Sequence, residues 1–302
     1  MIAGPTAVGK TAVAVALAEK IGGEIVSADS MQVYKFMDIG TAKPSPEELA
    51  RARHHMINEV APDTDYSVVK YQAAARACIE DIIKRGKIPV LCGGSGFYID
   101  AVLRGVSYDE TEKNAAYREE LAEEARRGGN GPLHARLKNI DPASYEKIHP
   151  NNVKRVIRAL EFYNKTGKRI SETSAEQKER GFYYRADIFI LNAERSNLYG
   201  RIERRTDAMM EAGLVNETCE LLSRGYGREL PAMNGLGYRQ AAAHIFGELG
   251  LDNAAAEIKR ATKNYAKRQL TWFRNQIRGE WIDATGLGAE DAAEIILSKI
   301  KF

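Results

Sequence analysis

One short segment near the start of the chain constrains its fold more than any other feature. Gly4-Pro5-Thr6-Ala7-Val8-Gly9-Lys10-Thr11 fits the pattern G-x-x-x-x-G-K-[ST]. The pattern is informative where it joins a strand to a helix, and here it follows the β-rich pair Ile2-Ala3 and precedes a helical pattern over residues 12–21. The segment therefore predicts an α/β fold of the P-loop NTPase-like kind, in which helices flank a parallel sheet and a phosphate-binding loop follows the first strand.

The residues of this loop have the chemistry that phosphate binding requires. Gly4 and Gly9 let the backbone wrap around phosphate oxygens, with its amides and the positive end of the next helix turned inward. Lys10 adds a cation for the terminal phosphates, and the Thr11 hydroxyl suits a Mg²⁺ ion that bridges them. We therefore expect a phosphorylated ligand and Mg²⁺. The reaction stays open because kinases, GTPases and motor ATPases share the loop, and a glycine turn without a ligand is the structural alternative.

Strand and helix patterns along the rest of the chain predict a core domain with an insertion. Further strands are expected at residues 24–28, 88–92, 187–191 and 281–282, and long helices at 67–85, 198–224 and 254–278. Residues 109–181 contain no convincing strand and instead have four helical patterns, at 117–127, 132–139, 142–148 and 153–165. We predict an α/β core formed by residues 1–108 and 182–302, interrupted by an all-helical insertion domain over residues 109–181.

Composition narrows the class of protein. The chain has 302 residues, 44% of them hydrophobic, and no apolar run approaches the roughly 20 residues of a membrane span. Cys78, Cys92 and Cys219 are widely spaced and form no CxxC pair, which predicts reduced thiols and neither a disulfide framework nor a zinc site. Because no basic leader or signal-like stretch precedes the loop, we expect a cytoplasmic protein without a membrane partner.

Positive charge is concentrated in two segments, although the net charge is only +3. Residues 151–170 contain six Lys/Arg against one acid, Glu161, and residues 259–278 contain seven against none. Such segments favour a polyphosphate partner. Five cations in the second segment would share one side of a continuous helix, namely Arg260, Lys263, Lys267, Arg274 and Arg278. A solvated helix face is the alternative, and Trp272 and Phe273 are interpreted as packing residues.

Segments spread through the chain resemble one enzyme family. In order they are the P-loop; Ser27-Ala28-Asp29-Ser30-Met31-Gln32-Val33-Tyr34 with Met37-Asp38-Ile39-Gly40-Thr41-Ala42-Lys43-Pro44; Gly93-Gly94-Ser95-Gly96-Phe97-Tyr98; Ile148-His149-Pro150-Asn151-Asn152 continuing to Glu161; Gly235-Leu236-Gly237-Tyr238-Arg239-Gln240; and Lys267-Arg268-Gln269-Leu270-Thr271-Trp272-Phe273. Together they resemble the tRNA dimethylallyltransferase (tRNA isopentenyltransferase) family, in its bacterial type. The resemblance implies a transferase that moves the dimethylallyl group of dimethylallyl pyrophosphate to N6 of the adenine 3′ of the anticodon in tRNA and releases pyrophosphate.

Asp29 is the candidate general base. An adenine amine is a poor nucleophile, so its attack benefits from a carboxylate that accepts a proton, and Asp29 follows the predicted strand 24–28 at the edge where α/β proteins place ligands. The resemblance implies the same role, whereas a carboxylate beside Mg²⁺ is the alternative. By resemblance, Arg205 stabilises the leaving pyrophosphate and Thr11 completes the catalytic set. A solvated helix face is the alternative for Arg205.

The resemblance also implies a tRNA-binding set. It consists of Asp29, Ser30, Met31, Gln32, Ser95, Arg118, Lys154, Arg155, Val156, Ile157, Arg158, Lys267 and Arg268. The cations of the insertion would grip the anticodon stem-loop, whose loop bases are the least costly to extrude into a pocket. Two members have ordinary alternatives, because Gln32 could be a turn-stabilising amide and Ser95 could belong to a tight glycine turn.

Three other functions remain open at this point. An adenylate isopentenyltransferase acting on free nucleotides has the same chemistry but no stem-loop for an insertion to hold. An ATP-dependent small-molecule kinase explains the P-loop but neither the basic segments nor the insertion. A non-catalytic RNA-binding module needs neither Lys10 and Thr11 nor Asp29. No stable protein partner is indicated.

Overall fold

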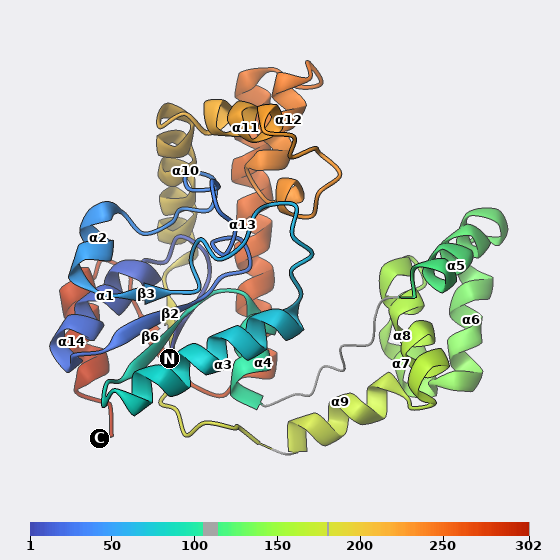
Figure 1. Ribbon diagram of the computed structural model, residues 1–302, viewed down its shortest axis with the longest axis horizontal. Helices are drawn as coiled ribbons and strands as arrows, with labels where there is room; N and C mark the ends of the chain where they lie inside the picture. Colours follow the sequence, from blue (N-terminus) through green and yellow to red (C-terminus); the bar gives the residue numbers. More distant parts are fainter. Residues whose placement is uncertain (105–113, 180, 302) are drawn as a thin grey trace. The chain divides into compact units, whose positions relative to one another are not determined.

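The computed structural model describes residues 1–104, 114–179 and 181–301. The chain divides into two compact units, one formed by Met1–Val102 with Arg185–Phe302 and the other by Leu103–Tyr184. Figure 1 shows both units. The predicted insertion, residues 109–181, falls within the second unit, and its first residues, 109–113, lie outside the described part of the chain.

A six-stranded parallel sheet forms the centre of the first unit. Its strands are β1 (Ile2–Ala3), β2 (Glu24–Ala28), β3 (His54–His55), β4 (Pro89–Gly93), β5 (Phe189–Asn192) and β6 (Glu280–Asp283), in the spatial order β3-β2-β4-β1-β5-β6. Every pairing is parallel, and Ile2 of β1 lies opposite Cys92 on one side and Phe189 on the other. The predicted parallel sheet is therefore confirmed, and the P-loop leaves it from a central strand.

Helices cover the sheet and extend beyond it. In the first unit they are α1 (Lys10–Ile21), α2 (Pro46–Arg51), α3 (Val68–Lys84), α4 (Gly96–Arg104, whose last two residues belong to the second unit), α10 (Arg195–Glu211), α11 (Leu214–Ser223), the 3-10 helix η1 (Ala232–Asn234), α12 (Tyr238–Ile245), α13 (Leu251–Gln276) and α14 (Ala289–Leu297). α1 packs against α14 and the central strands, while α3 packs on β2 and β4 (Figure 1).

The helix that follows the P-loop is held by small apolar side chains. α1 buries Val13 through Ala18, a run of valine, alanine and leucine, in a cluster with Ile2, Ile25 and Leu191 of the sheet. Burying one valine or leucine side chain contributes roughly 1.5–3 kcal/mol. Because the short alanines let the helix lie close to the strands, the first turn of α1 has a fixed position relative to the strand ends.

Two predictions about the helices are corrected. The expected helix over residues 198–224 is two helices, because Gly213 adopts a φ of 97° between α10 and α11. The expected row of five cations along one helix is wrong in part. α13 ends at Gln276, before Arg278, and the acids that pair with Arg260 and Lys263 are Glu257 and Glu203, which lie outside the counted segment.

All the regular elements in the described part of the second unit are helices. It contains α5 (Ala115–Gly128), α6 (Asn130–Ile140), α7 (Pro142–Lys147), α8 (Val153–Thr166) and α9 (Ile170–Glu179). Leu121, Leu133, Leu137 and Leu160 form its core. In neither unit does a described helix combine the length and apolarity needed to cross a bilayer.

Candidate active site

The P-loop has backbone angles that favour glycine at its start and end. Gly4 has a φ of 149° and Gly9 a φ of 100°. A side chain at Gly4 would also meet the carbonyl oxygen of Leu191 at 2.5 Å. Ala7 adopts a φ of 66° without being glycine. Lys10 begins α1, and its Nζ donates a hydrogen bond to the carbonyl oxygen of Pro5 at 2.7 Å, so the ammonium group curls back over the loop.

Side chains from α10 and α13 hold the loop from outside. Arg205 Nη2 donates to the Thr6 hydroxyl at 2.5 Å, and Arg201 Nη1 donates to the carbonyl oxygen of Val8 at 3.0 Å. The Thr6 amide donates to Gln269 Oε1 at 2.8 Å. Segments about 200 and 260 residues downstream therefore fix the loop's shape before any ligand binds.

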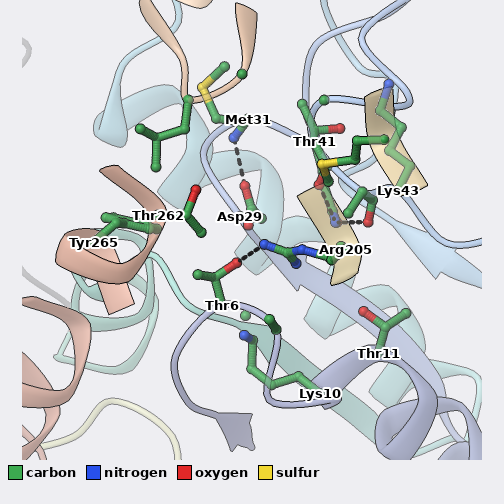
Figure 2. A pocket seen from close by; sticks show the side chains of 18 of the residues that line it. Thr6, Lys10, Thr11, Asp29, Met31, Thr41, Lys43, Arg205, Thr262 and Tyr265 are labelled. Carbon is green, nitrogen blue, oxygen red and sulfur yellow. Dashed lines mark hydrogen bonds between the residues drawn. The ribbon is translucent and has the colours of Figure 1, made fainter. Parts of the chain in front are cut away.

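Asp29 follows β2 and points into the same space as Lys10 of the P-loop and Arg205 of α10. Its Oδ1 accepts the backbone N–H of Met31 at 2.9 Å, which orients the carboxylate within the turn that follows the strand. Figure 2 shows Arg205 between Asp29 and Thr6, with Lys10 below them. The prediction that the carboxylate and the P-loop share one sheet edge is correct.

Gln32 and Ser95 use their polar groups inside the protein. Gln32 Oε1 accepts from the Ser27 hydroxyl at 3.0 Å, and Gln32 Nε2 donates to the carbonyl oxygens of Thr41 and Ala42 at 3.4 and 3.1 Å. The buried Ser95 hydroxyl accepts the amide of Ser30 at 2.9 Å. Both side chains therefore brace the turn that carries Asp29.

A cavity of about 830 Å³ connects these groups. Its lining includes Thr6, Lys10 and Thr11 from the P-loop region; Asp29, Ser30, Met31 and Gln32 after β2; Thr41 to Pro44; Arg201, Arg204 and Arg205 from α10; and Thr262, Tyr265 and Arg268 from α13. The volume falls within the roughly 300–1,000 Å³ that small-molecule sites occupy. Thr262 and Tyr265 approach Asp29 from the side opposite Lys43 (Figure 2).

Two cations of this cavity, Lys10 and Arg205, are partly buried without a matching acid. Burial lowers the pKa of Lys10 to about 8, and it also lowers the pKa of Arg205, in both cases against the opposing effect of the Asp29 charge. Neither cation forms an ion pair with any described residue. Burying unpaired positive charge costs free energy, so the cavity is poised to bind an anionic ligand.

The donor set in the cavity fits Mg²⁺ bound partly through a ligand. Among the described residues no three His, Cys, Asp or Glu side chains converge on one point. Mg²⁺ commonly takes only one or two protein oxygens beside substrate phosphates, and the Thr11 hydroxyl and the Asp29 carboxylate are such oxygens in the cavity lining.

The predicted tRNA-binding residues of the insertion fall into three groups. Lys154 and Arg155 are exposed on α8 and form no ion pair with a described residue. Arg118 is held by Glu161 through bonds of 2.7 and 2.6 Å, and Arg158 lies 3.6 Å from the same carboxylate. Val156 and Ile157 are buried in the core of the unit, so their side chains contribute packing and not an exposed surface.

The predicted residues of α13 face different sides of the helix. Arg268 lines the cavity that contains Asp29, whereas Lys267 lines a second cavity. Phe273 is fully buried, and the Trp272 ring lies so close to Gly96 that an added side chain there would meet it at 2.5 Å. The packing role predicted for these two aromatic residues is confirmed.

Sequence reasoning missed the residues that hold the site in shape. Glu217 accepts the backbone amides of Asp38, Ile39 and Gly40 at 2.8–3.2 Å and the Tyr238 hydroxyl at 2.6 Å. A single glutamate in a helical segment gives no sequence signal for such contacts. The only available signal was that Tyr238 and the loop before Pro44 both belong to motifs.

In this parallel sheet a glycine loop follows the central strand β1, and a carboxylate follows β2, which is separated from β1 by β4. With the partly buried cations that line the same cavity, these features define a P-loop α/β protein with an anion-binding cavity. The family model described as IPP transferase matches residues 32–276. The chain belongs to this family.

Individual relatives agree over the full length. The chain is 44% identical over 301 residues to a tRNA dimethylallyltransferase of Lachnoclostridium phytofermentans, covering 100% of this chain and 96% of the relative. It is 46% identical over 285 residues to the enzyme of that name from Geobacillus thermodenitrificans, covering 94% and 90% of the two chains.

Solved structures of the same family superpose on the chain. The tRNA isopentenylpyrophosphate transferase of Bacillus halodurans matches with a TM-score of 0.73 and 39% identity, covering 99% of this chain and 95% of that one. A eukaryotic dimethylallyltransferase acting on tRNA matches with a TM-score of 0.82 and 29% identity, covering 100% and 79%. The predicted resemblance and fold class are confirmed.

Proposed function

We propose that this protein transfers the dimethylallyl group of dimethylallyl pyrophosphate to N6 of the adenine 3′ of the anticodon in tRNA, and releases pyrophosphate. One observation carries the proposal: two partly buried cations without acid partners, Lys10 and Arg205, line the same cavity as the Asp29 carboxylate. The names of the similar proteins supply the substrate class.

The P-loop side of the cavity would bind the pyrophosphate. As the allylic C–O bond breaks, negative charge grows on the leaving oxygen, and preorganised donors at that position stabilise the transition state. Lys10 and Arg205 are such donors, and Thr6 keeps the Arg205 guanidinium turned toward the loop. When bound, Mg²⁺ would neutralise part of the pyrophosphate charge, with the Thr11 hydroxyl as its first protein ligand.

The opposite side of the cavity would accept the extruded adenine. A bond forms between N6 and the allylic carbon, the C–O bond to pyrophosphate breaks, and the proton lost from N6 passes to the Asp29 carboxylate. Met31 fixes one carboxylate oxygen through its amide, which leaves the other free to face the amine. Tyr265 and Thr262 from α13 form the wall beside it.

The RNA would be held outside the cavity by cations of both units. Lys154 and Arg155 present unpaired charge on α8, and Arg268 lies at the cavity wall on α13. An enzyme with tRNA as its substrate works where tRNA is matured, so we assign it to the cytoplasm.

Mass analysis of the RNA after incubation with dimethylallyl pyrophosphate tests this proposal directly. The expected result is one added prenyl unit on an anticodon stem-loop that carries the adenine, and none on the same RNA with that adenine replaced by guanine. Parallel incubations with AMP and with ATP distinguish the alternatives. Prenylation of AMP in preference to the stem-loop, or consumption of ATP without use of the prenyl donor, overturns the proposal.

A further inference from the structure

A second cavity lies on the other side of α13 from the proposed active site. Its volume is about 560 Å³, which is large enough for one nucleotide by the usual size of ligand pockets, roughly 300–1,000 Å³. Asn192 and Asp283, the last residues of β5 and β6, form its floor, and Arg195 and Tyr199 of α10 form one wall. Like the active site, it therefore opens at the carboxyl edge of the sheet.

The helix α13 lies between the two cavities, and two consecutive residues of it line different ones. Lys267 lines the second cavity and Arg268 lines the first. An α-helix with its side chains is only about 10–12 Å across. A single polynucleotide strand can therefore cross α13 with one nucleotide in each cavity.

The cations of the second cavity are free to bind a ligand. Arg195, Lys267 and Arg274 line it, and none of their charged groups forms an ion pair or hydrogen bond with a described residue. Two of them are held over aromatic rings: Arg195 lies 5.1 Å from the centre of the Tyr199 ring and Arg274 lies 5.9 Å from that of Trp281. These contacts orient the guanidinium groups without neutralising their charge.

The same cavity offers groups that suit a base. Trp281 is 38% exposed, and an exposed indole provides a surface on which a base can stack. Asn192 Oδ1 is buried and has no hydrogen-bond partner among the described residues. A buried oxygen acceptor without a partner is costly, and a base N–H would satisfy it.

The charge balance selects among phosphorylated ligands. Glu194 and Asp283 also line the cavity, and the Asp283 carboxylate accepts the amide of Thr285 at 2.9 Å. Three cations against two acids leave one net positive charge. That charge matches the single negative charge of a phosphodiester within an RNA chain better than the multiple charges of a free nucleotide or pyrophosphate.

We propose that this cavity is a second RNA subsite, which holds one nucleotide of the anticodon loop next to the modified adenine, with its phosphodiester on Arg195 and its base on Trp281. The inference rests on the proposed function, because it assumes an RNA substrate whose target base occupies the first cavity. The subsite would hold the loop strand on both sides of α13 and so fix which base enters the active site.

Paired arginine variants test the subsite. The probe is an anticodon stem-loop RNA, and binding is measured by fluorescence anisotropy at several salt concentrations. Arg195→Ala should weaken binding about tenfold and lower the steepness of log Kd against log salt by about 0.7, the loss of one phosphate contact. Arg224→Ala is the matched control, since Arg224 also lies over an aromatic ring, that of Phe36, away from both cavities. Equal affinities for the two variants overturn the proposal.

Trp281 provides a second variant that does not depend on charge. Trp281→Ala should weaken stem-loop binding about tenfold or more with an unchanged salt slope, and Trp281→Phe should retain most of the affinity because stacking needs only an aromatic face. Dimethylallyl pyrophosphate binding should be unchanged in all of these variants. Stem-loop affinity in Trp281→Ala equal to that of the wild-type protein contradicts the base contact.

Replacing single phosphates of the RNA by uncharged groups identifies which loop nucleotide occupies the subsite. A methylphosphonate at one loop position should weaken binding to the wild-type protein but not to Arg195→Ala, so that the two changes are not additive. Additivity at every loop position overturns the subsite. Failure of the proposed function would be a separate result. If the wild-type protein binds the stem-loop but adds no prenyl unit, the proposed function is wrong while the subsite still stands.

Discussion

Arg205 donates a hydrogen bond from Nη2 to the Thr6 hydroxyl oxygen at 2.5 Å, and this contact joins α10 to the P-loop. Through this hydrogen bond, an arginine nearly 200 residues away in the sequence lies against the P-loop. Burial lowers the pKa of Arg205, so its charge is costly until an anion arrives. An unpaired guanidinium in this position therefore interacts strongly with the negative charge of a leaving pyrophosphate.

Removing the Arg205 guanidinium should slow turnover more than removing the Thr6 hydroxyl. Arg205→Ala should lower kcat by about 10²–10³, as for other preorganised donors to a developing anion. Thr6→Val should lower kcat only about tenfold, because the guanidinium remains but loses its orientation, and Thr6→Ser should restore it. Steady-state kinetics with the stem-loop RNA measures both effects. Wild-type turnover in Thr6→Val would show that the hydrogen bond has no part in orienting Arg205.

Asp29 can be tested with a substitution that keeps its structural contact. Asp29→Asn retains an oxygen for the amide of Met31 but cannot accept a proton from the adenine amine. Turnover should fall by about 10² or more, while the Kd for the stem-loop stays within a few fold of wild type. A large loss of RNA binding with little change in kcat would instead make Asp29 a binding residue.

Lys10 should give the binding of the prenyl donor a pH dependence. Burial lowers its pKa to about 8 from 10.5, and the diphosphate binds the ammonium form. Affinity for dimethylallyl pyrophosphate should therefore be constant below about pH 8 and should fall as the pH rises above it. In the ligand-free protein the sign is opposite: the unfolded chain binds more protons between pH 8 and 10.5, so stability rises with pH in that window.

Calorimetric titration of the donor between about pH 7 and 9.5 measures this dependence. Lys10→Arg is the control, because a guanidinium keeps its charge throughout the range, so its affinity should not change with pH. If wild type and Lys10→Arg show the same fall in affinity above pH 8, the titrating group is not Lys10.

The sequence predicted the parts of this protein that depend on local pattern. The P-loop and the strand that ends before Asp29 could be placed because glycine spacing and apolar runs constrain the backbone directly. The break at Gly213 was missed, since an isolated glycine within a helical pattern is often tolerated. β3 was missed because two residues, His54 and His55, carry no periodicity.

The side-chain partners of the site could not be predicted for a different reason. The resemblance implied that Arg118 grips the RNA, yet Glu161, more than 40 residues away, accepts two of its hydrogen bonds. A motif match gives no sign of a side-chain partner that tertiary structure brings in from a distant segment. The same holds for Gln32, whose amide is satisfied by the carbonyls of Thr41 and Ala42.

The two unpaired cations of α8 should account for part of the RNA affinity. Replacing Lys154 and Arg155 together by Ala should weaken stem-loop binding and lower the salt slope by about 1.4, the value for two contacts to a single strand, without affecting the prenyl donor. Arg127→Ala is the matched control, because Arg127 is exposed in the same unit but paired with Glu123 at 2.8 Å. An unchanged salt slope in the double variant would place the RNA elsewhere.

Glu217 should set the position of Asp29 without touching a substrate. Its carboxylate accepts the amides of Asp38, Ile39 and Gly40 and the Tyr238 hydroxyl, and the same loop continues to the carbonyls that hold Gln32. Glu217→Gln places an N–H₂ group against these donors. We expect a loss of about 1–3 kcal/mol in stability and a kcat about tenfold lower per folded molecule, with the KM for the prenyl donor unchanged.

Tyr238→Phe removes only one of the four donors, so its effect on kcat should be smaller than that of Glu217→Gln. Glu248→Gln is the control for losing a carboxylate, because Glu248 pairs with Arg228 at the surface and should leave kcat unchanged. Thermal melting gives the folded fraction, and single-turnover kinetics gives the rate of the chemical step. If Glu217→Gln lowers the melting temperature but each folded molecule turns over at the wild-type rate, Glu217 only stabilises the fold and does not position Asp29.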